Sequence, residues 1–268
     1  MPEGHTIHRM AQDHAHWFSN KTVALSSPQG RFHEGALALN GSTFDSANAY
    51  GKHLFHYYRK EGQVTCIHIH LGLYGKFRKR KNSPHSLPSP NCRLRIQSDT
   101  DLLDLSGPTC CEILTMDEVK VKQSQLGPDP LRVDGNVDRF VHNLSKRRIP
   151  IAAALLNQKV IAGLGNIYRA ELLFKHRIHP LTPAHALKKS TIYEMWHTAV
   201  WWLALGVREN RIITTVDESS IHSKQLPHHE SLMVYGQSRC SICNHTIEPV
   251  EIGNRRLFAC FTCQIKTH

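Results

Sequence analysis

The chain has 268 residues, of which 40% are hydrophobic, so it can form one large domain or, as we favour, two moderate ones. Lys and Arg outnumber Asp and Glu by 33 to 22, which gives a net charge of +11. This excess predicts a polyanionic partner, nucleic acid above all, although a basic protein without such a partner is the alternative. No apolar run approaches the roughly 20 residues of a membrane-spanning helix, so the composition argues against a membrane protein.

The N-terminal region has the pattern of a sheet-rich domain. Apolar residues at helical spacing predict a first helix over residues 6–18. Short strands are predicted over residues 54–58, 64–70 and 92–96, because these segments are rich in β-branched and aromatic residues. Three prolines within residues 83–90 predict a loop. We therefore expect a sheet with one helix packed on it.

The pattern becomes helical after Leu126-Gly127-Pro128-Asp129-Pro130, which interrupts any regular element. Helices are predicted over residues 137–144, 149–158, 166–174 and 190–207, and a mobile polar loop over 215–232. The predicted domains are an N-terminal domain over 1–113, a linker over 114–132, a helical domain over 133–232 and a zinc finger over 233–268.

Four cysteines near the C-terminus, Cys240, Cys243, Cys260 and Cys263, have the spacing C-x2-C-x16-C-x2-C. Two close pairs of thiolates can surround one tetrahedral Zn2+, and such a site leaves no ligand position for water, so the metal is structural. Two disulfides are the alternative, but the start MPEGHTIHR lacks an apolar signal segment. We expect the finger to unfold without zinc and the other domains, with separate cores, to survive.

The remaining cysteines, Cys66, Cys92, Cys110 and Cys111, lack paired metal spacing and are interpreted as ordinary thiols. His68 and His70 alternate along a predicted strand, so both point to one face. A second metal site at this face is the less favoured alternative.

Met1 precedes a small residue, so its excision would leave the secondary amine of Pro2 at the N-terminus. An N-terminal amine titrates at a pKa of about 7.7–8, and its neutral form can attack a sugar C1′ and form an iminium. Glu3 could move protons to and from the sugar oxygen. Its alternative role is to stabilise a helix dipole as a leading acid.

Four motifs occur in a characteristic order: Pro2-Glu3-Gly4, Gly51-Lys52-His53-Leu54, Gly163-Leu164-Gly165-Asn166-Ile167-Tyr168 and the four-cysteine module. Together they resemble the formamidopyrimidine-DNA glycosylase/endonuclease VIII family of base-excision repair enzymes over nearly the whole chain. The resemblance implies an α+β fold, with an N-terminal β-sandwich and flanking helix, a helix-two-turn-helix domain and a zinc finger. It implies damaged DNA as the partner, bound in a cleft between the domains.

The resemblance also implies residue roles: Pro2 as Schiff-base nucleophile, Glu3 as proton donor in base excision, and Lys52 as a residue that assists protonation and elimination. A solvated strand cation is the alternative for Lys52. Arg255 corresponds to the finger arginine that grips phosphates, and Arg256 is the less favoured candidate. Asn166 opens a helix whose free N–H groups can receive a phosphate. The side chains of Leu73 and Tyr74 would fill the gap left by an everted base; Leu71 could instead belong to the core.

Gly4 with Leu73-Tyr74 resembles the endonuclease VIII branch, and the N-terminal sequence resembles its actinobacterial subgroup. This implies a bifunctional glycosylase and AP lyase that removes oxidised pyrimidines and cleaves the strand by β,δ-elimination. Gln125 stands where related proteins carry a phosphate-contacting arginine, which puts that contact in doubt. The alternatives are an 8-oxoguanine/formamidopyrimidine glycosylase and a non-catalytic zinc-finger protein that binds damaged DNA. We expect a bacterial, cytoplasmic, nucleoid-associated monomer.

Overall fold

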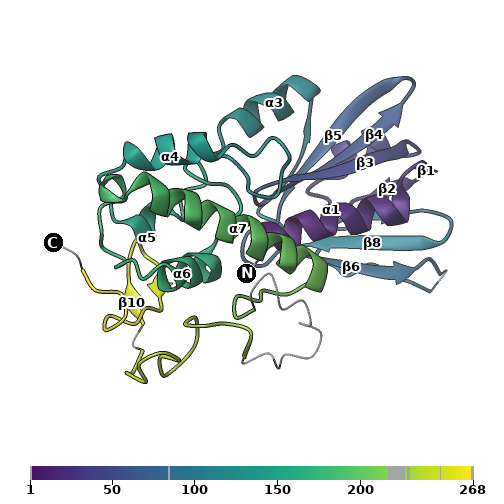
Figure 1. Ribbon diagram of the computed structural model, residues 1–268. Coiled ribbons are helices and arrows are strands. Elements are labelled where there is room, and N and C mark those ends of the chain that lie inside the picture. Colours follow the sequence, from purple (N-terminus) through teal and green to yellow (C-terminus); the bar gives the residue numbers. More distant parts are fainter. Residues whose placement is uncertain (1, 84, 217–226, 228–229, 248, 267–268) are drawn as a thin grey trace. The chain divides into compact units, whose positions relative to one another are not determined.

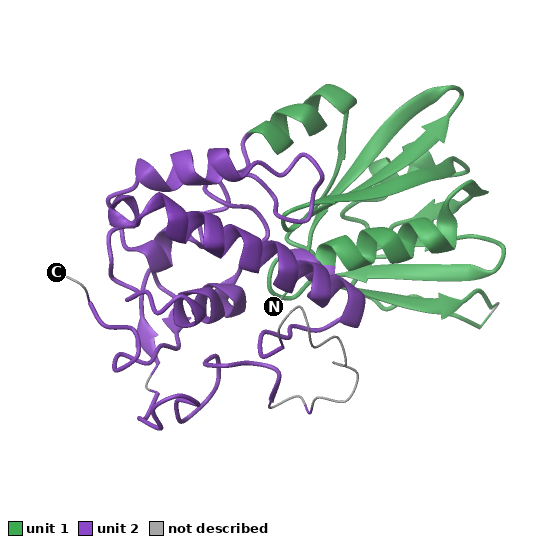
Figure 2. Ribbon diagram, in the orientation of Figure 1, with its two compact units in different colours: residues 1–2, 7–124 green, residues 3–6, 125–268 purple. Residues whose placement is uncertain are grey.

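The computed structural model describes residues 2–83, 85–216, 227, 230–247 and 249–266, and its ribbon runs from N to C as coloured in Figure 1. The chain divides into two compact units, which Figure 2 shows in different colours. Unit 1 comprises residues 1–2 and 7–124, and unit 2 comprises residues 3–6 and 125–268. None of the helices in the described part of the chain has the length and apolar character needed to cross a membrane.

Unit 1 is rich in strands, as the sequence pattern predicts, and they form two antiparallel sheets, as the family resemblance implies. The first sheet has the order β1 (Lys21–Thr22), β3 (Thr43–Tyr50), β4 (His53–Lys60), β5 (Gln63–His70), β9 (Cys110–Leu114). The second has the order β2 (Ala24–Ser26), β7 (Cys92–Gln97), β8 (Asp101–Ser106), β6 (Lys76–Lys81). Three helices accompany them: α1 (Gly4–Phe18), α2 (His33–Leu39) and α3 (Met116–Ser124). Helix α3 falls within the segment expected to be a linker.

One apolar core joins the two sheets and α1. Alternate residues of β5, Ile67 and Ile69, contribute to it from the first sheet, and Leu94 and Ile96 of β7 contribute from the second. Because side chains alternate across a strand, the neighbours of Ile67 and Ile69 lie on the outer face. The predicted β-sandwich is therefore confirmed, and the period-two pattern of β5 has its physical cause in this core.

A pair of histidines is buried in this unit. His14 of α1 and His56 of β4 are almost completely buried, and their Nδ1 and Nε2 atoms lie 2.9 Å apart. Burial holds the pKa of His14 well below its usual range, with the His56 charge as a smaller cause, and burial lowers the pKa of His56 to about 3. Both imidazoles are therefore neutral in the folded protein at pH 7.

This pair should make unit 1 sensitive to acid. Unfolded histidines bind protons below about pH 6.5, whereas the folded pair does not until the pH is several units lower. The contribution of the neutral His14–His56 pair to folding stability is thus complete above pH 6.5 and is lost as the pH falls towards 3. We expect the urea midpoint to drop between pH 7.5 and pH 5, and the drop to be smaller in His14→Leu/His56→Phe. An equal drop in the double variant would contradict this assignment.

Unit 2 is mainly helical. Its elements are α4 (Val137–Ser145), α5 (Ile151–Ala154), α6 (Asn166–Lys175), the 3-10 helix η1 (Ala184–Ala186), α7 (Lys189–Glu209) and a hairpin of β10 (Val250–Glu251) and β11 (Arg256–Leu257). The helices predicted over 137–144, 166–174 and 190–207 are confirmed with small shifts at their ends. The loop predicted over 215–232 lies largely outside the described residues.

The helix predicted over residues 149–158 is wrong over most of its length, because only α5 forms there. Pro150 occupies the N-cap position with extended backbone, and turns follow Ala154. Ile151 and Leu155 are nevertheless completely buried. The apolar spacing in this segment therefore reflects burial in the core and not a continuous helix.

The four-cysteine module shares the core of the helices. Ile247, Leu257 and Cys260 are buried in the same apolar cluster as residues of α4, α6 and α7. Gln264 also donates from Nε2 to the Ile178 carbonyl oxygen at 2.9 Å. The expectation that the helical core excludes the finger is thus wrong, since the finger completes one side of that core.

Candidate functional site

In unit 2 the Glu3 carboxylate lies at the N-terminus of α6. Its two oxygens accept hydrogen bonds from the backbone N–H groups of Gly165 and Ile167, both at 2.8 Å, and a longer one from Tyr168 at 3.5 Å. The side chain is buried. A helix N-terminus presents unpaired N–H groups and a partial positive charge, so it is a favourable place for a buried carboxylate. Glu3 is thereby held in one orientation.

Two glycines make this approach possible. A Cβ at Gly165 would lie 2.3 Å from Cδ of Glu3, and a Cβ at Gly4 would lie 2.8 Å from Cα of Gly163. The Gly4 N–H donates to the Gly163 carbonyl oxygen at 2.8 Å. The Gly-Leu-Gly-Asn turn therefore receives the N-terminal segment. The expectation that free N–H groups of α6 receive a phosphate is wrong for the three groups that Glu3 occupies.

Helix α6 also holds the finger hairpin. Asn166 donates from Nδ2 to the Arg256 carbonyl oxygen at 2.7 Å, and its Oδ1 accepts from the Arg169 guanidinium. Arg169 donates to the carbonyl oxygens of Ala152 at 3.2 Å, Ile252 at 3.4 Å and Arg256 at 3.3 Å. Asn166 is thus directed towards the hairpin, and its role in DNA binding stays a prediction.

The turn of the hairpin has the form that its sequence favours. Gly253 and Asn254 both have positive φ, 64° and 55°, and the Ile252 N–H donates to the Arg255 carbonyl oxygen at 3.0 Å. Two-residue hairpin turns often need positive φ at both central positions, which Gly and Asn tolerate. The side chains of Arg255 and Arg256 are exposed on this hairpin.

The charge of Arg255 affects the pKa of the buried Arg169 in the same unit. Burial lowers the pKa of Arg169 to about 10, the Glu3 carboxylate opposes this shift, and the Arg255 charge adds to it. Glu3, Asn166 and the hairpin that carries Arg255 are therefore brought together around α6. Sequence reasoning missed Arg169, whose one local signal is a charged residue three positions after Asn166 in an apolar helix.

Glu171, also on α6, is a second polar residue that sequence reasoning missed. It is completely buried and accepts backbone N–H groups of Met233 at 2.8 Å, Val234 at 3.0 Å and Tyr235 at 2.8 Å, and the Thr214 hydroxyl at 2.5 Å. These contacts fix the segment that leads into the four-cysteine module. They span more than 40 residues of sequence, so no local pattern could reveal them.

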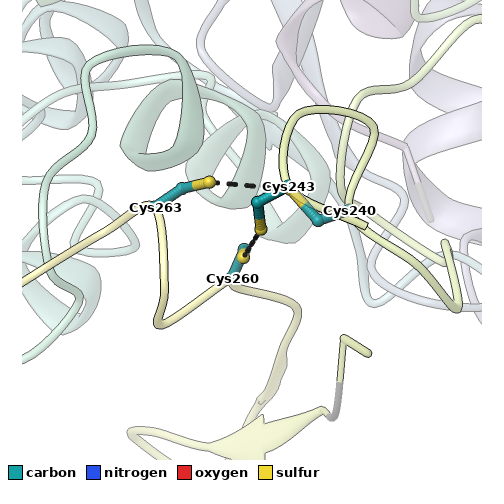
Figure 3. A group of neighbouring side chains, drawn as sticks. All are labelled: Cys240, Cys243, Cys260 and Cys263. Carbon is teal, nitrogen blue, oxygen red and sulfur yellow. Dashed lines mark hydrogen bonds between the residues drawn. The ribbon is translucent and has the colours of Figure 1, made fainter. Parts of the chain in front are cut away.

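The four cysteines converge, as Figure 3 shows. The Sγ atoms of Cys240 and Cys263 lie 3.8 Å apart, and those of Cys243 and Cys260 lie 3.5 Å apart. All four Sγ atoms lie within 4.8 Å of one another. Zinc–sulfur bonds of about 2.3 Å in a tetrahedron place sulfur atoms about 3.8 Å apart, so the spacing fits a four-thiolate metal site.

In unit 1, Lys52 lies in the tight turn between β3 and β4 and is partly buried. Its positive charge is close enough to His70 to add to the lowering of that pKa by burial. The turn after β5 exposes 55% of Leu73 and 81% of Tyr74, whereas Leu71 is buried in the core. Leu71 is therefore a core residue, and two apolar side chains remain on the surface.

A basic groove of about 680 Å³ lies beside this turn, within unit 1. Its lining includes Tyr74 and five cationic residues, which are Arg31, Lys76, Arg78, Arg80 and Arg93. Arg80 forms an ion pair with Asp104, and Arg93 donates to the Gln29 side chain at 2.8 Å. An aromatic side chain next to several cations is suited to a polyanion that carries bases.

Comparisons with known proteins show the family to which the chain belongs. The model of the formamidopyrimidine-DNA glycosylase N-terminal domain matches residues 1–107, and the model of the formamidopyrimidine-DNA glycosylase H2TH domain matches residues 126–218. Endonuclease 8 1 of Mycobacterium tuberculosis (strain ATCC 25618 / H37Rv) is 41% identical over 271 residues, 98% of this chain and 100% of that protein. Formamidopyrimidine-DNA glycosylase of Chloroflexus aurantiacus is 36% identical over 52% of this chain and 50% of its own.

Solved structures share the fold. Lactococcus lactis Fpg, in complex with DNA containing N7-benzyl-Fapy-dG, superposes with a TM-score of 0.81 and 22% identity, covering 99% of this chain and 100% of that one. MutM in complex with DNA containing carbocyclic 8-oxo-G gives a TM-score of 0.83, with the same identity and coverage. The chain therefore belongs to the formamidopyrimidine-DNA glycosylase/endonuclease VIII family, whose members are DNA glycosylases and AP lyases.

Proposed function

We propose that this protein excises oxidised pyrimidines from DNA and then cleaves the strand at the abasic site, with the amine of Pro2 as nucleophile. The observation that carries the proposal is the Glu3 carboxylate, which is fixed by the N-terminus of α6 one peptide bond from Pro2. The full-length likeness to Endonuclease 8 1 favours that branch of the family. The 8-oxoguanine alternative is retained as an outcome of the test.

The reaction needs a neutral amine, a proton relay and an electron sink. After Met1 is removed, the Pro2 nitrogen attacks C1′ and the damaged base leaves with a proton. The C1′–O4′ bond then breaks as O4′ is protonated, and the resulting iminium draws electrons from C2′. Loss of a C2′ proton expels the 3′ phosphate, and a second elimination expels the 5′ phosphate. Glu3 would transfer protons at the opening sugar ring, and Lys52 would assist protonation.

The DNA contacts follow from charge and shape. We assign phosphate binding to Arg255, which the hairpin exposes, and to the cations of the basic groove in unit 1. Leu73 and Tyr74 would fill the gap left by an everted base, because exposed apolar side chains can replace lost stacking. Asn166 would act by keeping the hairpin in place. One structural Zn2+ would occupy the four-thiolate site.

Borohydride trapping tests the nucleophile. We expect the mature protein to form a stable covalent adduct with duplexes that contain an oxidised pyrimidine or an abasic site. Pro2→Gly should trap far more slowly, and an uncleaved N-terminal extension should abolish trapping by blocking the amine. A panel that also contains 8-oxoguanine duplexes separates the two substrate classes. Normal trapping by the N-terminally extended protein would assign the nucleophile to another amine.

Glu3→Gln should separate base excision from strand cleavage. The amide keeps the shape but removes the proton transfer, so excision of an intact oxidised base should fall far more than cleavage of a preformed abasic site. It also places an NH2 group against backbone donors, which should cost about 1–3 kcal/mol of stability. Single-turnover rates on both substrates, measured beside thermal unfolding, distinguish these effects.

Glu171→Gln is the matched control, since Glu171 is a second buried carboxylate of unit 2 that accepts three backbone N–H groups. It should lower stability to a similar extent without separating the two rates. If both variants lose excision and cleavage in equal proportion, Glu3 has a structural role only.

Zinc and Arg255 should act on DNA affinity through the same hairpin. Removal of zinc by a chelator is expected to destabilise unit 2, because the module shares its core, while the β-sandwich signal of unit 1 persists. Arg255→Ala in the zinc-loaded protein should weaken DNA binding and reduce the salt slope by about 1, because one fewer phosphate is neutralised. Fluorescence anisotropy at several salt concentrations measures the DNA affinity and its salt slope for the zinc-free protein and for Arg255→Ala.

Arg256→Ala, at the neighbouring position of the hairpin, is the control for Arg255 and should change affinity less. Equal effects of the two substitutions would remove the special assignment of Arg255. An unchanged salt slope after complete zinc removal would show that the hairpin does not bind phosphate.

A further inference from the structure

The outer face of the first sheet in unit 1 carries a cluster of metal-ligand side chains outside the proposed catalytic residues. In the register of β5 and β9, His68 pairs directly with Glu112, and His70 pairs with Cys110. Cys110 and Glu112 are two positions apart, so their side chains point to the same side of β9. That side is opposite to the core-facing Ile67 and Ile69.

We propose that His68, Cys110 and Glu112 form a second metal site, for Zn2+ or a divalent cation of similar preference. His68 Nδ1 lies 2.9 Å from Glu112 Oε1 and 3.7 Å from Cys110 Sγ, and the three ligand atoms lie within 4.8 Å of one another. Tetrahedral zinc with bonds of about 2.0–2.3 Å places such atoms roughly 3.3–3.8 Å apart. The triangle therefore needs only small side-chain rotations to surround an ion.

A fourth side chain, His53, contacts the other ring nitrogen of the His68 imidazole. His53 Nδ1 lies 2.9 Å from His68 Nε2. When His68 carries its proton on Nε2 and donates it to His53, its Nδ1 lone pair is free to bind a cation. Ligating histidines usually have such an outer partner, which fixes the ring and its tautomer. His68 is buried, whereas Cys110 and Glu112 are partly exposed, so an ion can enter from solvent.

A cation already occupies part of this position. Lys122 of α3 has its Nζ 3.0 Å from Glu112 Oε1, the same oxygen that contacts His68. The ammonium uses only the carboxylate, whereas Zn2+ also uses the thiolate and the imidazole. Metal binding would displace Lys122, whose side chain is 32% exposed, and would release the Cys110 thiol proton to solvent. Three protein ligands leave one position for water.

The sequence did not favour this site. Cys110 lacks the paired spacing of metal-binding cysteines and was therefore interpreted as an ordinary thiol. The less favoured alternative of a second metal site involved His68 and His70. The structure brings Cys110 and Glu112 to His68 instead, by pairing β9 with β5. The inference rests on unit 1 alone and is independent of the proposed glycosylase reaction.

Cobalt binding to the zinc-loaded full-length protein tests the site. We expect Co2+ to bind at one equivalent beyond the zinc and to give tetrahedral visible bands with a single-thiolate charge-transfer band. Cys110→Ser should remove the charge-transfer band, and His53→Leu should weaken cobalt affinity about 10–100-fold. Lys122→Met should tighten it, because the competing cation is gone. Zn2+ should displace the Co2+ without changing the protein fold.

Cys111→Ser is the matched control, since Cys111 is the next residue of β9 and packs against the core on the opposite face. It should leave the cobalt spectrum unchanged. The proposal is overturned if neither the wild type nor Lys122→Met binds Co2+ beyond the zinc, which would leave an ion-pair network only. A cobalt spectrum that survives Cys110→Ser would overturn it equally, because the ion would then occupy the four-cysteine site.

Discussion

The buried Glu3 carboxylate joins the N-terminal segment of the chain to the N-terminus of α6, and the arrangement around this helix depends on it. Burying a carboxylate is costly unless donors surround it, and here backbone N–H groups of Gly165, Ile167 and Tyr168 supply them. Gly165 must lack a side chain for this contact to form. The two residues are 162 positions apart in sequence, so the reason for a buried acid at one and a glycine at the other is visible only in the folded structure. Because Pro2 is bonded to Glu3, the same anchor restrains the nitrogen that we propose as the nucleophile.

Helix α6 extends this arrangement to the finger. Three of its polar side chains, Asn166, Arg169 and Glu171, are buried, and each bonds to backbone groups of segments near the C-terminus. A buried polar group left without a partner costs stability, so displacement of these segments would be penalised at several positions at once. The hairpin that exposes Arg255 is thereby linked through α6 to Glu3. Glu3 and the hairpin that carries Arg255 are thus both anchored at the N-terminal end of one helix.

The elements that the sequence predicted well are those whose cause is local. The four cysteines are close pairs, and apolar residues alternate with histidines in β5 because one face of that strand meets the core. The helix predicted over 149–158 was too long, because the apolar spacing continues beyond the short α5 into a turn, where Leu155 is buried in the core. Arg169 and Glu171 were missed because most of their partners are distant in sequence: Arg169 bonds to the hairpin 83 and 87 residues away, and Glu171 to groups at least 43 residues away. Family resemblance supplied the role expected of Lys52, and it supported the role that the chemistry of an N-terminal secondary amine suggests for Pro2.

Because the four-cysteine module shares the core of unit 2, metal binding at its thiolates would affect the stability of more than the module itself. A finger with its own small core would lose or gain its metal without consequence for the helices. Here Leu257, directly after the hairpin arginines, is completely buried with residues of α6 and α7, and Cys260 is buried beside them. The free energy of metal binding at the four thiolates would therefore contribute to the stability of the whole of unit 2. Loss of the ion would disturb the backbone carbonyl oxygens that Asn166 and Arg169 bind, and through them the N-terminus of α6 where Glu3 is held. A metal at the four thiolates would be structural in this wider sense: it would help to fix the helix against which the Glu3 carboxylate is held.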